Sequence, residues 1–329
     1  MIKDTSRHRV ARCIVLSIAC LSAAGHATAQ PSEKEQCFNF DALTPELRAK
    51  SEAYLLHALD TEPLFTLASG LKPMSGGFFN ASVRPVAHSR RTSEEASAVV
   101  NKLGRKRGSS LREDERAALA SAQEIVKDAA AWKEIEELRE ILPTWKCGGE
   151  VYADVVHYAV THDGERQLQG VIFSVPSLRR LLAEKRQFFS RWALTPNASP
   201  LEVVLAVEYS RDVSRFAGYG YLFGYPDEAV QFFATASASQ DATGVFVKRD
   251  FRAIPTFEKD SGQFTYAVEK GIADTAEDID LRTIAAEVLK DYRARRVAYI
   301  GPGKPGVVAL VRDWFCPQED QCRPSQVPK

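Results

Sequence analysis

The spacing of apolar residues predicts helices throughout the first half of the chain. Leu55 and Leu59 recur at helical intervals behind the start signal Thr44-Pro45-Glu46, and Pro63 allows a second, short helix to begin. Glycines and prolines over residues 70–77 then predict a loop.

A long helical hairpin is expected next. The capping-box sequence Ser110-Leu111-Arg112-Glu113 opens a stretch without proline or glycine that runs to Leu142, and Pro143 ends it. A helix over 92–103 precedes this stretch. The connection between the two helices is basic and contains Lys102, Arg105, Lys106 and Arg107. Such a tip fits a solvated turn or a contact with an anionic surface.

The second half of the chain mixes strand and helix patterns. Valine- and tyrosine-rich runs over 151–160 and 169–175 flank Asp163-Gly164, which predicts a β-hairpin. A second hairpin is expected around Asp260-Ser261-Gly262. The remaining strands are predicted over 297–300 and 307–311, and the helices over 176–192, from Ser199 through Arg215, over 227–236 and over 276–295.

Strands mixed with unpaired helices in this way predict the α+β class. A helical N-terminal half over residues 30–148, with its long hairpin, would pack with a mixed, mostly antiparallel sheet and helices. The sheet and these helices would come from residues 149–329. The two regions are expected to form one globular body.

The first 29 residues have the features of a cleaved signal peptide. Four basic residues precede an apolar run over 13–24, and Ala27-Thr28-Ala29 is a small-x-small cleavage sequence. The run is shorter than the ~20 residues that span a bilayer. Cleavage would leave Gln30 first in a soluble, periplasmic or secreted protein without a membrane span. The alternatives are a buried N-terminal helix and a lipoprotein attached through Cys20.

The mature chain keeps four cysteines, and an even number in an exported protein indicates disulfide pairing. Cys316 and Cys322 are close enough in sequence to close a local loop, which leaves Cys37 to pair with Cys147. A zinc site is the rival interpretation. It requires Cys-x2–4-Cys pairs, and the cysteine spacing here does not supply them.

Composition narrows the classes of function. The 329 residues include 43 basic and 43 acidic ones, and 45% are hydrophobic, as is ordinary for a globular protein. Without the signal, 39 basic and 42 acidic residues remain, so the chain lacks the basic excess of a nucleic-acid-binding surface. No metal or cofactor is expected. The histidines are not paired at helical spacing, and the glycine-rich segments depart from the phosphate- and dinucleotide-binding patterns.

One constellation predicts a ligand site. On a continuous helix from Ser199, four charged residues fall within an arc of about 100°. A glycine-spaced aromatic loop follows, and residues 72–80 are a candidate second wall. The predicted ligand-binding residues are Glu208, Arg211, Asp212, Arg215, Tyr219, Tyr221 and Tyr225. The simpler interpretation is a structural salt-bridge network, in which Glu208 pairs with Arg211 and Asp212 with Arg215.

The sequence therefore predicts an exported α+β protein that binds a small polar ligand or an envelope protein, and not nucleic acid. The alternative is a secreted or envelope hydrolase with acid/base carboxylates near Glu208 and Asp212, which requires one of them to be buried with a raised pKa. The segment Ser69–Lys72 matches the Ser-x-x-Lys sequence of penicillin-binding enzymes, but their partner motifs are missing from the chain.

Overall fold

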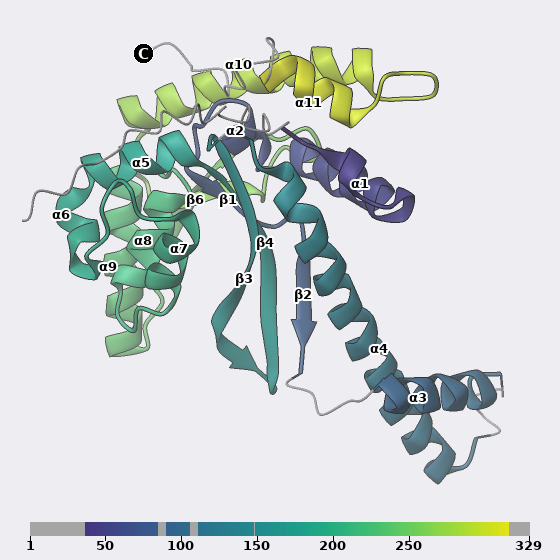
Figure 1. Cartoon of the computed structure of the whole chain (residues 1–329). Helices are drawn as coiled ribbons and strands as arrows, with labels where there is room; N and C mark the ends of the chain where they lie inside the picture. The colour runs from purple at the N-terminus through teal and green to yellow at the C-terminus, as the bar shows by residue number, and fades with distance from the viewer. Residues whose placement is uncertain (1–36, 85–89, 106–110, 148, 316–329) are drawn as a thin grey trace, which may run out of the picture. The chain divides into compact units, whose positions relative to one another are not determined.

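A computed structural model describes residues 37–84, 90–105, 111–147 and 149–315 (Figure 1). The chain divides into two compact units, Met1–Lys34 and Glu35–Lys329, and every described residue belongs to the second. Within the described residues, eleven α-helices and two antiparallel sheets form an α+β fold, as predicted. The expected signal peptide and the pair Cys316 and Cys322 lie outside the described residues.

The first helices form where their start signals predict them. A 3-10 helix, η1 (Phe40–Ala42), precedes α1 (Pro45–Asp60). The Thr44 hydroxyl accepts the Leu47 N–H at 3.3 Å and so satisfies one of the free N–H groups at the start of α1. The single-turn helix α2 (Leu64–Leu67) follows, and all four of its residues are buried.

The helical hairpin is confirmed, although its second helix starts later than predicted. α3 (Arg90–Leu103) packs on α4 (Glu113–Ile141). The Glu115 carboxylate accepts the Arg112 N–H at 3.1 Å and closes the first turn of α4. The predicted cap, Ser110, lies outside the described residues.

A four-stranded antiparallel sheet is built around β4 (Glu165–Ser174). β3 (Val151–His162) pairs along one side of β4, with a change of register between His157 and Thr161. β1 (Met74–Ser75) and β2 (Asn80–Val83) pair one after the other along its opposite side. β4 is therefore the one strand that contacts all the others in this sheet.

The hairpin between β3 and β4 is confirmed, and its turn residues Asp163 and Gly164 both have positive φ. The loop predicted over 70–77 is only partly right, because β1 lies inside it and β2 follows. The N-terminal half thus contributes two strands to the sheet. Strands of two and four residues carry too little alternation to be detected in a sequence.

Helices follow β4 directly. The single helix predicted over 176–192 is divided into α5 (Val175–Glu184), α6 (Arg186–Phe189) and the 3-10 helix η4 (Ser190–Trp192). α7 (Pro200–Glu208) begins with the predicted capping box, in which the Ser199 hydroxyl accepts the Glu202 N–H at 3.2 Å.

The helix that begins at Ser199 does not continue to Arg215, so that prediction is wrong. α7 ends at Glu208, residues 209–213 form a bend, and α8 (Ser214–Leu222) starts afresh. The next helix, α9 (Asp227–Thr243), extends beyond the predicted 227–236 and ends at Gly244, whose φ is +71°.

The last part of the chain contains the second predicted hairpin. β5 (Arg249–Ile254) pairs with β6 (Phe264–Glu269), and α10 (Ala276–Tyr299) and α11 (Val307–Phe315) follow. The strands predicted over 297–300 and 307–311 are wrong, because these runs lie mainly in α10 and α11. The apolar residues of α11 form a buried helical face, and so short a run does not distinguish helix from strand in a sequence.

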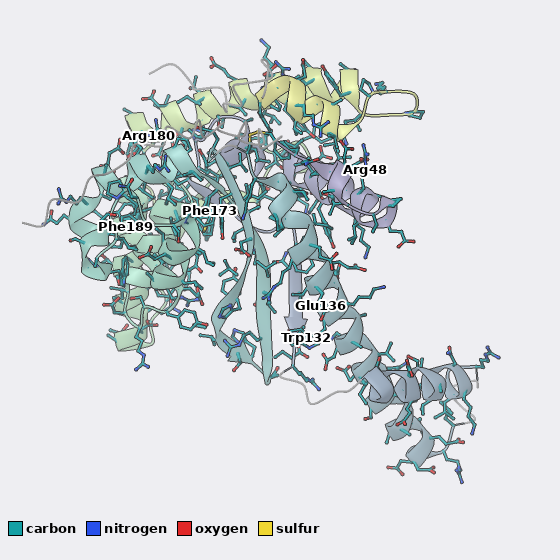
Figure 2. The ribbon with its side chains drawn as sticks, viewed as in Figure 1. Arg48, Trp132, Glu136, Phe173, Arg180 and Phe189 are labelled. Atoms are coloured by element: carbon teal, nitrogen blue, oxygen red, sulfur yellow. A yellow bond between two sulfur atoms is a disulfide. The ribbon has the colours of Figure 1, made fainter. Side chains whose placement is uncertain are left out.

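The two faces of the four-stranded sheet belong to separate cores, because successive side chains of a strand point to opposite faces. Ala153 and Ile172 pack in the core that includes α1 and α4. Val171 and Phe173 pack in the other core with helices α5 to α8, where Phe189 also lies (Figure 2).

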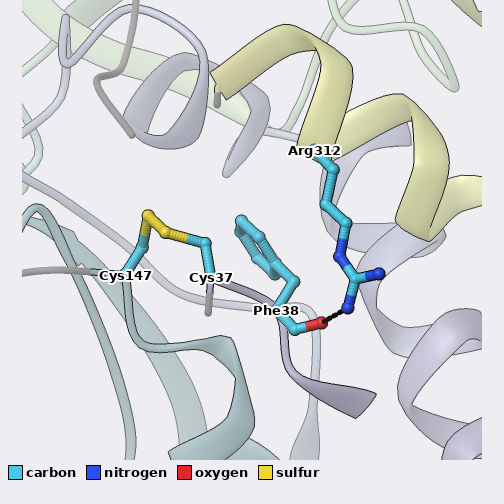
Figure 3. Close-up of a disulfide and its surroundings, with 4 residues drawn as sticks. All are labelled: Cys37, Phe38, Cys147 and Arg312. Atoms are coloured by element: carbon cyan, nitrogen blue, oxygen red, sulfur yellow. Dashed lines mark hydrogen bonds between the residues drawn. A yellow bond between two sulfur atoms is a disulfide. The ribbon is translucent and has the colours of Figure 1, made fainter. Parts of the chain in front are cut away.

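A disulfide joins the start of the described chain to the residues that precede β3, as predicted. Cys37 and Cys147 are 110 residues apart in the sequence, and their Cα atoms are 4.3 Å apart. Next to it, the Arg312 guanidinium donates to the Phe38 carbonyl at 3.0 Å (Figure 3). The same short segment is therefore held by the bridge on one side and by α11 on the other.

Candidate functional site

The predicted site residue Glu208 is the centre of a closed hydrogen-bond network. Its side chain is 0% exposed, and its Oε1 accepts the Ala159 N–H at 2.7 Å. The Arg215 guanidinium donates to both carboxylate oxygens at 2.9 and 3.2 Å, and the Tyr219 hydroxyl donates to Oε2 at 2.6 Å. One carboxylate thus ties the end of α7 to β3 and to α8.

The charged residues therefore pair differently from the pattern expected on one helix. Glu208 binds Arg215 instead of Arg211, because the bend over 209–213 carries α8 back past the end of α7. Arg211 is exposed and makes no hydrogen bond or ion pair within the described part of the chain.

Asp212 works as a cap for α8. Its Oδ1 accepts the Ser214 N–H at 2.9 Å and the hydroxyls of Ser214 and Ser210. These hydrogen bonds hold the pKa of Asp212 below its ordinary value, and the bond from the Ser214 hydroxyl contributes most. An exposed carboxylate with a lowered pKa is a poor general acid at neutral pH.

The three predicted tyrosines face three different neighbourhoods. Tyr219 belongs to the Glu208 network. The pKa of its phenol is raised, mainly by burial and next by the hydrogen bond to Glu208. The ring of Tyr221 lies 5.0 Å from that of Phe188. Tyr225 packs against β6, 5.5 Å from the ring of Tyr266. The structure therefore brings together Glu208, Arg215 and Tyr219, but not all seven predicted residues.

The aromatic segment over 219–225 is mostly helix and not the predicted loop, because α8 runs to Leu222. Its glycines allow close packing. A Cβ at Gly220 would lie 2.8 Å from Val230 of α9. Gly224 has φ +69°, and a Cβ there would lie 2.7 Å from the Leu71 carbonyl oxygen. The chain at Gly224 and the chain at Leu71 and Lys72 therefore meet with their backbones in direct contact.

Sequence reasoning missed a buried lysine at this contact. Lys72 is 0% exposed, and its ammonium donates to Glu62 Oε2 at 2.6 Å. It also lies 4.2 Å from the ring centre of Phe264 and 5.3 Å from that of Phe223. Burial lowers the pKa of Lys72 below its ordinary value, and the Glu62 carboxylate opposes this shift. The only sequence signal is a lysine inside a segment otherwise made of glycine, proline, serine and apolar residues.

The contacts of Lys72 argue against the Ser-x-x-Lys interpretation. The Ser69 hydroxyl donates to the Phe65 carbonyl at 2.8 Å, while the lysine ammonium is turned to Glu62. The lysine is therefore not placed to take the serine proton.

A pocket of about 140 Å³ has a lining that begins at Pro226, the residue after Tyr225. It lies between the start of α9, the end of β6 and the start of α10. Its lining consists of Pro226, Glu228, Ala229, Phe232, Val268, Glu269, Ile272, Thr275 and Asp278. None of the seven predicted ligand-binding residues is in this lining, although Pro226 directly follows Tyr225. The predicted site at those seven residues stays a prediction.

The wall of this pocket is connected to the buried lysine through aromatic side chains. Tyr266 donates its hydroxyl proton to Asp278, which lines the pocket. On its other side Tyr266 contacts Tyr225, which packs on Phe264 near Lys72. The pocket therefore has a rigid back wall, because each of these groups is packed or hydrogen-bonded.

Among the described residues, no three or more histidine, cysteine, aspartate or glutamate side chains are grouped so as to hold a metal ion. None of the helices in that part of the chain has the length and apolar character needed to span a bilayer. Comparisons with protein-family models, with curated proteins and with solved structures find no match.

Proposed function

We propose that the protein is an exported binding protein that holds a small molecule in the pocket between α9, β6 and α10. The pocket itself carries this proposal. Its lining contains the apolar side chains of Ala229, Phe232, Val268 and Ile272 together with a few polar groups, and small-molecule sites combine these two kinds of group.

Export rests on two independent observations. The first 29 residues combine a basic start, a short apolar run and an Ala-x-Ala sequence. The Cys37–Cys147 disulfide suits the oxidising compartments outside the cytoplasm. Together they support a periplasmic or secreted location.

The hydrolase alternative has less support from the geometry. Glu208 accepts from Ala159, Arg215 and Tyr219, so its oxygens are occupied. Asp212 is occupied by Ser210 and Ser214. General acid/base catalysis needs a carboxyl group free to exchange a proton with a substrate.

Methyl NMR of the mature chain tests the binding proposal. A fragment library is added, and the methyl signals of Ala229, Val268 and Ile272 are followed. We expect at least one fragment to shift these signals without moving those of Val160 and Val297, which are exposed and not in the lining. A library that leaves all three pocket signals in place would overturn the proposal.

A further inference from the structure

The charges around the pocket are of one sign. Its lining contains three carboxylates, Glu228, Glu269 and Asp278, and no lysine, arginine or histidine. Among the cations nearby, Lys185 binds Asp227, and Arg252 and Arg282 both bind Asp274. Arg249 lies opposite Glu269 in the pairing of β5 with β6, but its guanidinium packs over the rings of Phe233 and Phe246. None of these cations forms an ion pair with Glu228 or Glu269 within the described part of the chain.

One of the three carboxylates is committed to the fold. Asp278 is 3% exposed and accepts hydrogen bonds from the Tyr266 hydroxyl and from the N–H and hydroxyl of Thr275. Thr275 in turn accepts the Asp278 N–H and caps α10. The polar groups of Asp278 and Thr275 therefore already have hydrogen-bond partners in the protein, and few remain to bind a ligand.

The other two carboxylates are free to meet a ligand. Glu228 and Glu269 are exposed, and neither side chain has a hydrogen bond or ion pair within the described residues. Glu228 lies in the first turn of α9, and Glu269 is the last residue of β6. The two therefore place carboxylates without an ion pair next to the apolar lining residues.

The size of the pocket limits the apolar part of the ligand. A cavity of about 150 Å³ in a protein interior holds one benzene molecule. The pocket here has nearly that volume, and Phe232 offers an aromatic ring in its wall. An aromatic or similarly sized apolar group fits, and an aromatic wall also favours a cationic group beside it.

We infer that this pocket binds a small organic cation, an ammonium group on an apolar body about the size of a benzene ring. This inference rests on the proposed binding function of the same pocket. The apolar body lies on Ala229, Val268 and Ile272, and the ammonium group faces Glu228 and Glu269. An anionic ligand of the same shape is repelled by those two carboxylates.

Three probes of nearly equal shape and different charge test the inference: benzylammonium, benzyl alcohol and benzoate. Their dissociation constants for the mature chain are measured from the methyl shifts of Val268 and Ile272. We expect benzylammonium to bind about 5–20-fold more tightly than benzyl alcohol, since exposed ion pairs each contribute up to a few-fold. Benzoate should bind more weakly than either.

Matched variants locate the effect. The double substitution Glu228→Gln and Glu269→Gln should bring the affinity for benzylammonium down to that for benzyl alcohol, and leave benzyl alcohol binding unchanged. The double substitution Asp241→Asn and Glu287→Gln makes the same change in net charge at exposed positions of α9 and α10 outside the lining. It should change the affinity for benzylammonium less than twofold.

The outcomes separate the two proposals. Benzyl alcohol binding as tightly as benzylammonium would overturn the cation inference and leave the binding function standing. The same holds if the two double variants weaken benzylammonium equally. If no fragment and no probe shifts the pocket methyl groups, the binding function and the inference both fail.

Discussion

Glu208 and Arg215 form the ion pair on which α7, α8 and β3 converge, and its removal is expected to destabilise the protein. Arg215→Ala leaves a fully buried carboxylate with only Tyr219 and the Ala159 N–H as donors. We expect a loss of about 3 kcal/mol in the free energy of unfolding, the lower end for a broken buried pair. Urea denaturation measures it.

Arg211→Ala is the matched control, because it removes the same side chain from an exposed position. Its effect should stay within about 0.5 kcal/mol. Equal destabilisation by the two substitutions would contradict the structural role assigned to Arg215.

The buried pair of Lys72 and Glu62 is asymmetric, because the lysine side chain is 0% exposed and the glutamate 19%. Glu62→Gln strands a buried ammonium and should cost about 3 kcal/mol at pH 7. Lys72→Met should cost less, since Glu62 reaches water and methionine fits among aromatic rings. Urea denaturation of both variants, with Glu258→Gln as an exposed control, shows which substitution lowers the free energy of unfolding more.

The same pair predicts a dependence on pH. Burial lowers the pKa of Lys72 from its ordinary 10.5, and loss of Glu62 lowers it further. Above the folded-state pKa and below 10.5, the unfolded chain binds more protons than the folded one, so stability rises with pH. The deficit of Glu62→Gln should therefore shrink as the pH rises from neutral toward 10.5, the ordinary pKa of a lysine. A deficit that grows with pH would contradict this account.

At this scale the sequence placed some neighbouring residues in one group but did not predict their pairs. Glu208, Arg215 and Tyr219 do meet, but the pairing with Arg211 assumed a helix that the bend at 209–213 interrupts. Lys72 was not recognised as a buried charge, because its burial depends on Phe223 and Phe264, about 150 and 190 residues further along the chain. Contacts between residues so distant leave no local pattern.

Among the connections between elements, the turn from α8 to α9 depends on Gly224. Its φ of +69° and its approach to Leu71 make alanine doubly unfavourable. Gly303 has a similar φ of +72°, but nothing lies within 4 Å of the position of its Cβ. We expect Gly303→Ala to cost about 1 kcal/mol. Gly224→Ala should cost about 1–3 kcal/mol more, the usual cost of overpacking. Thermal and urea unfolding of the two variants measure these losses in the free energy of unfolding.

Element boundaries were predictable where a cap marks them. Thr44, Ser199 and Thr275 each accept the N–H three residues ahead, and the helices begin there. Where no cap stood, the assignment depended on short apolar runs, and α11 was taken for a strand. The pocket could not be predicted, because its lining comes from three elements that only the tertiary fold brings together.

The Cys37–Cys147 disulfide is expected to contribute to the stability of the whole unit. It closes a loop of 110 residues, for which the chain-entropy account gives about 4–5 kcal/mol. The double substitution of Cys37 and Cys147 by alanine should lower the free energy of unfolding by that amount. The corresponding change at Cys316 and Cys322 should cost less, because their loop is short. Urea unfolding, with peptide mapping under non-reducing conditions, tests both.

The export prediction is tested on the protein from its native host. Cleavage after Ala29 should leave Gln30 as the first residue, because Ala27-Thr28-Ala29 is the small-x-small sequence behind the apolar run. Mass spectrometry of the mature chain reads that residue directly. A cytoplasmic protein that retains residues 1–29 would contradict the prediction.

The position of β4 in the middle of its sheet has a consequence for the order of events during synthesis. Met74 pairs with Phe173 and Val83 with Arg166, so β1 and β2 find no partner until ~80–100 further residues have left the ribosome. Contacts of such long range make folding slow, because the chain must close a large loop and lose entropy before the strands can form hydrogen bonds. The four-stranded sheet therefore cannot form until β4 has been synthesised, even if the earlier helices form before it. Under the export proposed above, a sheet that closes late would keep the chain open for passage through a membrane.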